Sequence, residues 1–324
     1  MLILLVYFLF ASTFTLGKAV LSYCNPILFI GVRMSLAGFI LLVIASIKNQ
    51  WSVINRDNRA LFFQIIIFHI YCAYVFEFWA LNYMTSSKTA LIYNISPFIT
   101  AFLSYIVLDD RLNKMTYKKW VGLGIGMLGM VSWLISHASG PETKLMSFWF
   151  VSWPELSLLF AVTSAAYGWI VMHMLLAKHE GSPLFINGYG MLGGGLLALA
   201  TSLVVEGKPY LKVPQVYSSW IHQYLAVTFG LYYASWILFL LYLVLLIIIA
   251  NGICYNLYGA LLRRYSATLL SFAGFTCPLF AAVLGWFFHG EAITYHFLIT
   301  LVIIFFGLYI FYQEELNPNQ IQKK

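Results

Sequence analysis

Long apolar segments alternate with short polar ones along the whole chain. Ten of these segments come close to the roughly 20 residues that a helix needs to cross the hydrocarbon core of a bilayer. The short polar stretches between them leave no room for a large soluble domain. The pattern predicts an all-α polytopic membrane protein with ten transmembrane helices. The predicted spans cover residues 2–22, 26–47, 61–82, 85–108, 119–138, 153–177, 183–205, 239–262, 266–289 and 293–313.

The apolar run 225–262 departs from this regular pattern. As a helix it would measure about 57 Å, which is too long for a single crossing. We place the eighth span at 239–262 and interpret residues 215–238 as an insertion that forms an aromatic interfacial helix on the outer face. In the alternative interpretation residues 215–238 also cross the membrane, which gives eleven spans and an outer C-terminus.

The sequence also contains an internal duplication. The segment NISPFITAFLSYIVLDD (94–110) aligns without gaps with FTCPLFAAVLGWFFHGE (275–291), and PILFIGVRMSLAG (26–38) matches PLFINGYGMLGGG (183–195). An odd number of spans in each copy inserts the second copy upside down relative to the first, as in many transporters. The paired positions are Pro97/Pro278, Asp110/Glu291, Tyr74/Tyr255, Gly126/Gly307, Gly31/Gly188 and Gly38/Gly195.

The duplication divides the chain into two helical repeats. We expect the first repeat at 1–138 and the second at 153–313, with the interfacial insertion inside the second. A loop at 139–152 joins the two repeats, and residues 314–324 form a cytoplasmic tail.

Composition supports a lipid-facing exterior. Hydrophobic residues make up 62% of the chain and charged residues 9%, with a mean hydropathy of +0.85; a soluble domain has about 25% charged residues. The net charge of +7 comes from basic residues scattered over short loops, so we expect the bilayer, and no nucleic acid, as a partner. The four cysteines lack the spacing of a metal site. No nucleophile–base arrangement or cofactor motif appears, so we expect neither an enzyme nor a bound cofactor.

The distribution of lysine and arginine predicts the orientation in the membrane, because cytoplasmic loops carry an excess of them. With both termini in the cytoplasm, the outer segments hold few basic residues, namely Lys18, Lys88, Lys144, Lys208 and Lys212. The cytoplasmic segments hold Lys48, Arg56, Arg59, Arg111, Lys114, Lys118, Lys119, Lys178, Arg263, Arg264, Lys323 and Lys324.

The first repeat concentrates four charged residues, Lys18, Arg33, Glu77 and Lys88, in one layer toward the outer face of the membrane. At 1.5 Å per residue, Glu77 lies about 24 Å from the cytoplasmic entry of its span, and Arg33 lies about 10 Å below the outer face. A charge inside the membrane costs roughly 2.5–3.5 kcal/mol on insertion scales, so such residues face a cavity or a partner. Glu77 is either a counter-ion for a cationic substrate, or a proton carrier, or the partner of Arg33 in a pair that locks two helices. Lys88 either contributes to the same layer or extends to the headgroups.

Uncharged polar residues and aromatic residues supply further candidates for substrate contact. His69, Asn94 and Asn251 lie near the midplane with Thr13 and Ser164, where they either bind substrate or join helices by hydrogen bonds. Aromatic side chains could line a cavity and stack on a flat or cationic ligand. The aromatic candidates are Tyr71, Tyr74, Trp79, Tyr93, Trp169, Tyr255 and Tyr258.

The duplicated prolines and acidic residues suggest moving parts. Pro97 and Pro278 would each free a backbone carbonyl in the middle of a span, which creates a hinge or a kink. Asp110 and Glu291 stand at helix–loop junctions, where gating or structural roles suit them better than catalysis.

These motifs resemble the drug/metabolite transporter superfamily, and in particular its ten-helix EamA-type members. The resemblance is carried by the two proline helices that end in acidic residues, the glycines that follow, and Arg33. It implies a secondary transporter of small polar metabolites, with a central cavity that opens alternately to each side. It also implies a bacterial inner (cytoplasmic) membrane location, as a monomer or homodimer.

A narrower resemblance concerns the substrate. The stretches FTLGK (14–18), EFWAL (77–81) and SSKTALIYNISPF (86–98) are similar to the chlamydial-type S-adenosylmethionine/S-adenosylhomocysteine transporters of the superfamily. This resemblance implies uptake of S-adenosylmethionine in exchange for S-adenosylhomocysteine. An amino-acid or drug exporter of the same superfamily is the alternative, and a non-transporting membrane enzyme or scaffold is less favoured.

The predicted topology can be tested with reporter fusions at the two ends of the chain. We expect green fluorescent protein to fluoresce, and alkaline phosphatase to stay inactive, at both termini, because both ends lie in the cytoplasm. Reporters that place the two ends on opposite sides of the membrane would contradict the inverted duplication.

Overall fold

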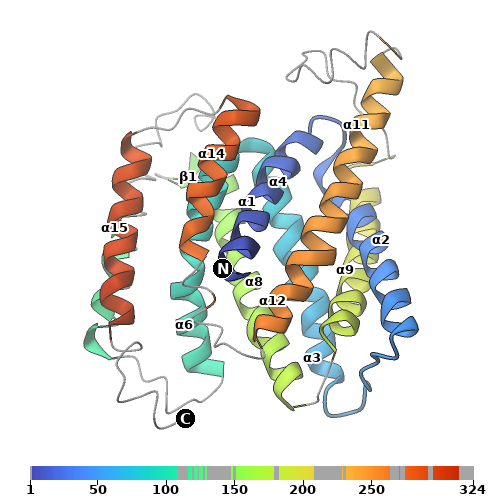
Figure 1. The fold of residues 1–324 in the computed structure, drawn as a ribbon, viewed down its shortest axis with the longest axis horizontal. Coiled ribbons are helices and arrows are strands. Elements are labelled where there is room, and N and C mark those ends of the chain that lie inside the picture. The colour runs from blue at the N-terminus through green and yellow to red at the C-terminus, as the bar shows by residue number, and fades with distance from the viewer. Residues whose placement is uncertain are drawn as a thin grey trace.

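The computed structural model describes residues 2–107, 147–148, 151–178, 182–207, 231–262, 274–290 and 295–313, together with residues 228 and 270 and scattered positions from 116 to 129. The chain is an all-α polytopic membrane protein whose helices form one bundle (Figure 1). The strands among the described residues are β1 (Ser147–Phe148) and β2 (Val151–Ser152), which pair antiparallel.

Seven helical stretches of the described residues are long and apolar enough to cross a membrane, by length and composition. They follow the predicted spans closely through the first repeat and the start of the second. In chain order the helices are α1 (Leu2–Val20), α2 (Pro26–Ile47), α3 (Arg59–Gln64), η1 (Ile65–Cys72), α4 (Ala73–Tyr83), α5 (Ser86–Tyr93), α6 (Ser96–Val107), α8 (Trp153–Lys178), α9 (Pro183–Val205), α11 (Leu231–Leu246), η3 (Ile247–Cys254), α12 (Tyr255–Leu262), η4 (Gly274–Thr276), α14 (Cys277–His289) and α15 (Tyr295–Tyr312).

The eighth predicted span differs from the helix in the structure. Elements α11, η3 and α12 form a continuous helix that begins at Leu231, and not at 239. Residues 231–238 therefore extend this helix, and they form neither a separate interfacial helix nor part of a separate span. Its apolar stretch Tyr233–Leu262 has 30 residues and measures about 45 Å, against a hydrocarbon core of roughly 30 Å. The free end of α11 accordingly rises past the neighbouring helices in Figure 1.

The remaining predicted spans lie in the less fully described part of the chain. Helix α14 covers the second half of the predicted span 266–289, and α15 lies within the predicted span 293–313. The predicted span 119–138 lies largely outside the described residues. So do Asp110 and Glu291, the proposed gate residues.

Pro97 and Pro278 begin helices, whereas the sequence predicted kinks within continuous spans. The fourth span is broken between α5 and α6, where Asn94 and Ile95 make tight turns back to Leu91 and Ile92. Pro97 is the second residue of α6, and Pro278 lies in the first turn of α14 directly after the short helix η4. Proline suits the first turn of a helix because its missing N–H would have no intrahelical partner there.

Each repeat contains a π-helix that the sequence analysis did not predict. Helix η1 has the sequence IIIFHIYC and η3 has the sequence IIIANGIC. His69 and Asn251 occupy the fifth position of their respective π-helices, and both are fully buried. π-helices are rare and are frequent at functional sites, so this pair directs attention to the interior of the bundle.

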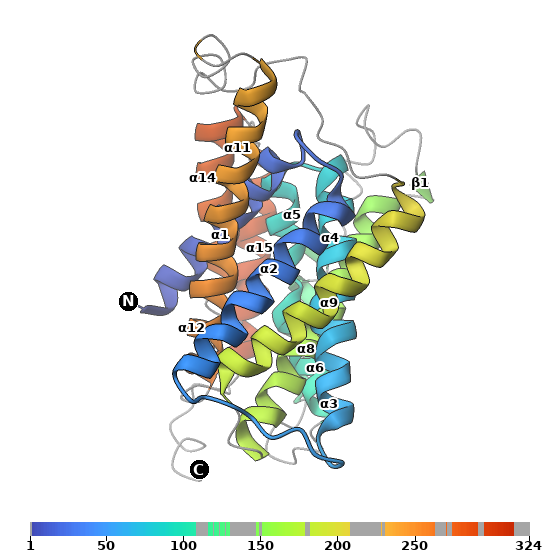
Figure 2. The ribbon, with the colours of Figure 1, turned by 90° about the vertical axis from the view of Figure 1, so that its right-hand side faces the viewer.

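Helices α2 and α9 lie side by side in a close crossing (Figure 2), and the glycines that the duplication pairs lie at their contact. A Cβ atom on Gly38 would clash with the backbone nitrogen of Leu192, and one on Gly195 would clash with that of Ser35. Gly31 and Gly188 also face the opposite helix. Small residues allow helix backbones to approach closely in a membrane. Glu206, at the end of α9, accepts hydrogen bonds from the backbone N–H groups of Ile27 and Leu28 and thereby ties α9 to the start of α2.

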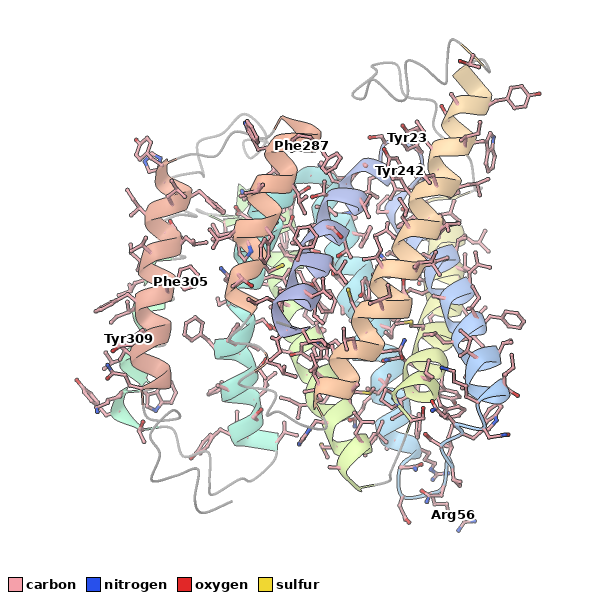
Figure 3. All side chains as sticks on the ribbon, viewed as in Figure 1. Tyr23, Arg56, Tyr242, Phe287, Phe305 and Tyr309 are labelled. Atoms are coloured by element: carbon pink, nitrogen blue, oxygen red, sulfur yellow. The ribbon has the colours of Figure 1, made fainter. Side chains whose placement is uncertain are left out.

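The outside of the bundle is apolar and rich in aromatic side chains (Figure 3). Phe287 and Tyr309 are 72% and 63% exposed, as expected of residues that face lipid. Tyr23 and Tyr242 pack together with ring centroids 6.0 Å apart, at the end of the bundle opposite Arg56.

The tight crossing predicts that Gly38→Ala destabilises the protein. The new methyl group would meet backbone atoms of α9, so the two helices must shift, at a cost of about 1–3 kcal/mol. We expect a lower melting temperature for the detergent-solubilised protein. Gly124→Ala is the matched control, because a Cβ atom on Gly124 would have no neighbour within 4 Å. Equal melting temperatures for the two variants would contradict the predicted role of the crossing.

Candidate functional site

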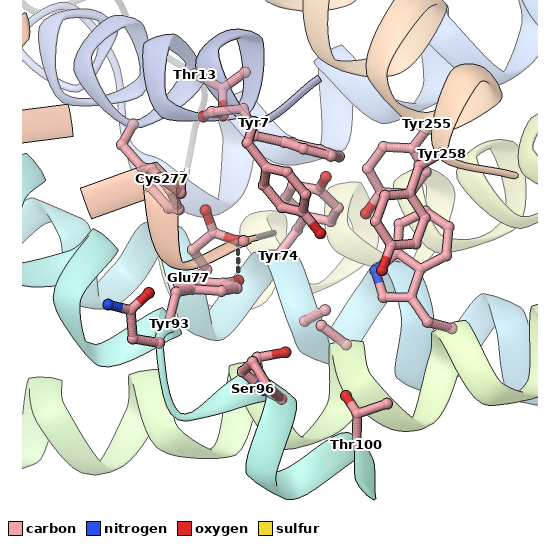
Figure 4. Close-up of a pocket in the computed structure, with 18 of the residues that line it drawn as sticks. Tyr7, Thr13, Tyr74, Glu77, Tyr93, Ser96, Thr100, Tyr255, Tyr258 and Cys277 are labelled. Atoms are coloured by element: carbon pink, nitrogen blue, oxygen red, sulfur yellow. Dashed lines mark hydrogen bonds between the residues drawn. The ribbon is translucent and has the colours of Figure 1, made fainter. Parts of the chain in front are cut away.

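A cavity of about 130 Å³ lies within the bundle. Helices α1, α2, α4, α6, α8, α12 and α14 contribute side chains to its wall, together with the break between α5 and α6 (Figure 4). The cavity brings together many of the residues predicted from the sequence. They are Arg33, Tyr74, Glu77, Asn94, Pro97, Tyr255 and Tyr258, and also Thr13, Tyr93 and Trp169.

Aromatic rings form much of the cavity wall. Trp169 lies between the two tyrosines of α12, with ring centroids 5.1 Å from Tyr255 and 4.3 Å from Tyr258. Tyr74 and Tyr255, which the duplication pairs, are in contact with centroids 6.0 Å apart. Such faces can stack on a flat ring and can attract a cation.

Glu77 lies in this wall and forms no ion pair with the residues that the structure describes. Its side chain is 7% exposed, and its carboxylate accepts a hydrogen bond from the hydroxyl of Tyr93 at 2.6 Å. Within the described residues, the ion pair joins Lys88 to Glu155. No ion pair links Glu77 to Arg33 among these residues. The structure therefore gives no support to a direct Glu77–Arg33 pair as a helix lock.

Among the described side chains that line the cavity, Arg33 is the only lysine or arginine. It is 1% exposed, and its Nε donates a hydrogen bond to Oδ1 of Asn251 at 2.9 Å. The guanidinium also lies over the rings of Tyr74 and Phe78, at 5.4 and 5.6 Å. Its Nη2 has no hydrogen-bond partner among the described residues. The cavity thus contains one cation and one anion, and neither is neutralised by an ion pair.

The two predicted asparagines occupy different positions relative to the cavity. Asn94 lines it at the break between α5 and α6, with an Nδ2 that lacks a hydrogen-bond partner among the described residues. Asn251 does not line the cavity; it lies behind Arg33 and donates weakly to the sulfur atoms of Met34 and Met191.

Three other candidates lie away from the cavity surface. His69 is fully buried behind the wall, with its ring centroid 4.4 Å from that of Trp169. Trp79 is half-buried and packs against Tyr83. Tyr71 shares a hydrogen bond with the hydroxyl of Thr201 at 2.7 Å.

Lys88 is engaged elsewhere in the structure. Its Nζ lies 2.6 Å from Oε1 of Glu155, in an ion pair that joins α5 to the start of α8. Glu155 is 2% exposed and also accepts a hydrogen bond from the backbone N–H of Ser152. Lys88 therefore binds protein and neither lines the cavity nor extends freely to the headgroups.

The sequence analysis missed several residues that line the cavity. Tyr7 and Phe14 lie one turn on either side of Phe10 on α1, and Ser96 and Thr100 lie one turn apart on α6. Helical spacing could have identified both sets, because residues three or four apart share a face. No spacing in the sequence distinguishes Cys277, because it is one of several cysteines that lie within apolar runs.

The sequence matches one known family over most of its length. Residues 1–135 and 152–313 match the EamA-like transporter family. The chain belongs to this family. It is therefore a transporter, with a small-molecule substrate and a multi-pass location in a bacterial membrane, and the predicted resemblance to the drug/metabolite transporter superfamily is confirmed.

Known proteins and a solved structure resemble this chain over nearly its full length. A protein of Chlamydia muridarum named S-adenosylmethionine/S-adenosylhomocysteine transporter is 32% identical over 99% of this chain and 93% of its own length. A protein of the same name from Chlamydia trachomatis serovar L2 is 31% identical over 99% of this chain and 90% of its own. A solved crystal structure with 16% identity shares the fold with a TM-score of 0.62, over 95% of this chain and 94% of the other.

The ion pair between Lys88 and Glu155 generates a stability prediction for this EamA-like transporter. We expect Glu155→Gln to lower the free energy of unfolding by about 3 kcal/mol, because one charge of a buried pair is left without its partner. The double variant Lys88→Met with Glu155→Leu should recover much of this loss, because it removes both charges. Thermal unfolding in detergent measures the effect, and additive losses in the double variant would contradict it.

Proposed function

We propose that this protein takes up S-adenosylmethionine in exchange for S-adenosylhomocysteine by alternating access. The names of the chlamydial relatives, which resemble this chain over 99% of its residues, support the substrate class. The proposal includes a bacterial inner-membrane location with both termini in the cytoplasm, as the distribution of basic residues predicts.

The observation that carries the proposal is the chemistry of the cavity. Glu77 presents a carboxylate that forms no ion pair with the described residues, beside the aromatic faces of Tyr74, Tyr255 and Trp169. S-adenosylmethionine carries two cationic groups, a sulfonium and an ammonium, together with a flat adenine ring. Aromatic faces attract such cations, most strongly where water is excluded, and they also stack on a planar base. One carboxylate within an aromatic wall therefore suits this ligand.

Alternating access is supported by the arrangement of the paired positions. Tyr74 contacts Tyr255 at the cavity, and the paired glycines meet in the crossing of α2 and α9. Both arrangements are expected if 1–138 and 153–313 are inverted repeats related by an axis through the bundle.

The size of the cavity implies that helices move during transport. Its volume of about 130 Å³ is below the roughly 300–1,000 Å³ of sites for drug-sized ligands. A nucleoside joined to an amino acid therefore requires the helices to separate. We propose that the broken segment before Pro97, and the corresponding start of α14 at Pro278, are the hinges for this movement.

Counterflow in proteoliposomes tests the substrate. Vesicles that contain the purified protein are preloaded with one unlabelled compound, and the uptake of labelled S-adenosylmethionine is then measured. We expect acceleration by S-adenosylmethionine and S-adenosylhomocysteine, and none by methionine, adenosine or a lipophilic cation. Failure of the two adenosyl compounds to accelerate uptake would overturn the proposal. Exchange of labelled amino acids or drugs in the same vesicles would support the alternative exporter.

The role of Glu77 can be tested with Glu77→Gln. We expect transport of S-adenosylmethionine to fall by about tenfold or more, which corresponds to roughly 1.4 kcal/mol or more. Expression and melting temperature should stay nearly unchanged, because glutamine can still accept the hydrogen bond from Tyr93. Asp57→Asn, which removes an exposed carboxylate from a loop, is the control. Parallel losses of folding and transport in Glu77→Gln would instead indicate a structural role.

A further inference from the structure

We propose that Arg33 binds the carboxylate of the substrate and that Asn251 is the positioning residue that aims its guanidinium. This inference rests on the proposed function and deepens it. It assigns one end of the cavity to the anionic end of an α-amino-acid moiety and the Glu77 side to the cationic groups.

The first support is a buried cation without a counter-ion. Arg33 is 1% exposed, forms no ion pair with the described residues, and has an Nη2 without a hydrogen-bond partner among them. An unpaired buried charge is strongly unfavourable, and cation–π contacts of the kind made with Tyr74 and Phe78 compensate for it only in part. A carboxylate from the ligand would complete the site, because a guanidinium matches a carboxylate with two parallel hydrogen bonds.

The second support is the orientation of the guanidinium. Asn251 binds Nε through its amide oxygen and so leaves the terminal nitrogens for another partner. The amide nitrogen of Asn251 faces the sulfur atoms of Met34 and Met191, which are weak acceptors. Asn256 donates to the backbone carbonyls of Asn251 and Gly252 and thereby fixes this turn of η3. Asn251 therefore acts on the ligand through Arg33.

The third support is that other basic residues near the cavity are already bound to protein. The Nζ of Lys88 is paired with Glu155, and the Nζ of Lys18 donates to the backbone carbonyls of Leu81 and Asn82. Arg33 is thus the cation that remains available among the described side chains of the cavity wall.

The two repeats place different residues at matching positions, so the two ends of the cavity differ chemically. The position that corresponds to Arg33 in the second repeat is Gly190, and, at the offset that pairs Tyr74 with Tyr255, the position that corresponds to Asn251 in the first repeat is Ile70. The arginine–asparagine pair therefore occurs at one of the two equivalent places. A ligand with distinct anionic and cationic ends would bind in a single orientation, with its carboxylate at Arg33 and its cationic groups toward Glu77.

Binding measurements with and without the ligand carboxylate test the proposal. The affinities of S-adenosylmethionine and of its decarboxylated analogue are compared by isothermal titration calorimetry on the purified full-length protein. We expect the wild-type protein to bind the carboxylate-bearing ligand about tenfold or more tightly. In Asn251→Ala this ratio should fall several-fold while Arg33 keeps its charge, and in Arg33→Gln it should approach one. Tyr71→Phe, which removes a hydrogen bond away from the cavity, should retain the wild-type ratio.

Each outcome decides a separate point. Equal affinities of the wild-type protein for the two ligands would overturn the carboxylate subsite while leaving the proposed function intact. Equal weakening of both ligands in a folded Asn251→Ala variant would overturn the positioning role. If S-adenosylmethionine, its decarboxylated analogue and S-adenosylhomocysteine all fail to bind, the proposed function itself is overturned, and this inference with it.

Discussion

Two opposite charges, Arg33 and Glu77, lie inside a bundle whose outer surface is apolar, and they form no direct ion pair with each other. The carboxylate is held by one tyrosine hydroxyl, and the guanidinium by one amide and two aromatic faces. Moving charges out of water is costly, and the cost is offset only when nearby groups are arranged around them. The aromatic wall and the polar residues behind it meet this requirement. They leave Nη2 of Arg33 without a hydrogen-bond partner among the described residues, and we propose that a ligand fills this place.

The backbone of the helices is adapted to the same requirement. Each π-helix ends within two residues of a tyrosine of the cavity, Tyr74 in one repeat and Tyr255 in the other. The wider i→i+5 turn changes which side chains face inward, so a polar residue can lie behind the wall while the tyrosine lies in it. The break before Pro97 has a comparable effect, because it turns Asn94 into the cavity at a point where a continuous helix would have no free polar groups.

Much of the fold could be predicted from the sequence, because lipid requires long apolar helices and the duplication leaves matched residues. The pairing of Gly38 with Gly195, for example, anticipates two positions in the helix crossing. The partners of charged side chains could not be predicted in the same way. The sequence places both Lys88 and Arg33 in predicted spans, and the neutralisation of Lys88 depends on Glu155, which is distant in the chain. The start of α11 was also missed, because an apolar run does not mark where the hydrocarbon ends.

The presence of Arg33 in one repeat, and of glycine at the matching position of the other, has a consequence for the origin of such a chain. If two identical subunits met in the same inverted arrangement, each would contribute its own guanidinium, and the two like charges would face each other across a symmetric chamber. Joining the copies in one polypeptide allows each to diverge alone. An asymmetric substrate can then bind in an asymmetric site, which an assembly of identical halves in a symmetric arrangement could not provide.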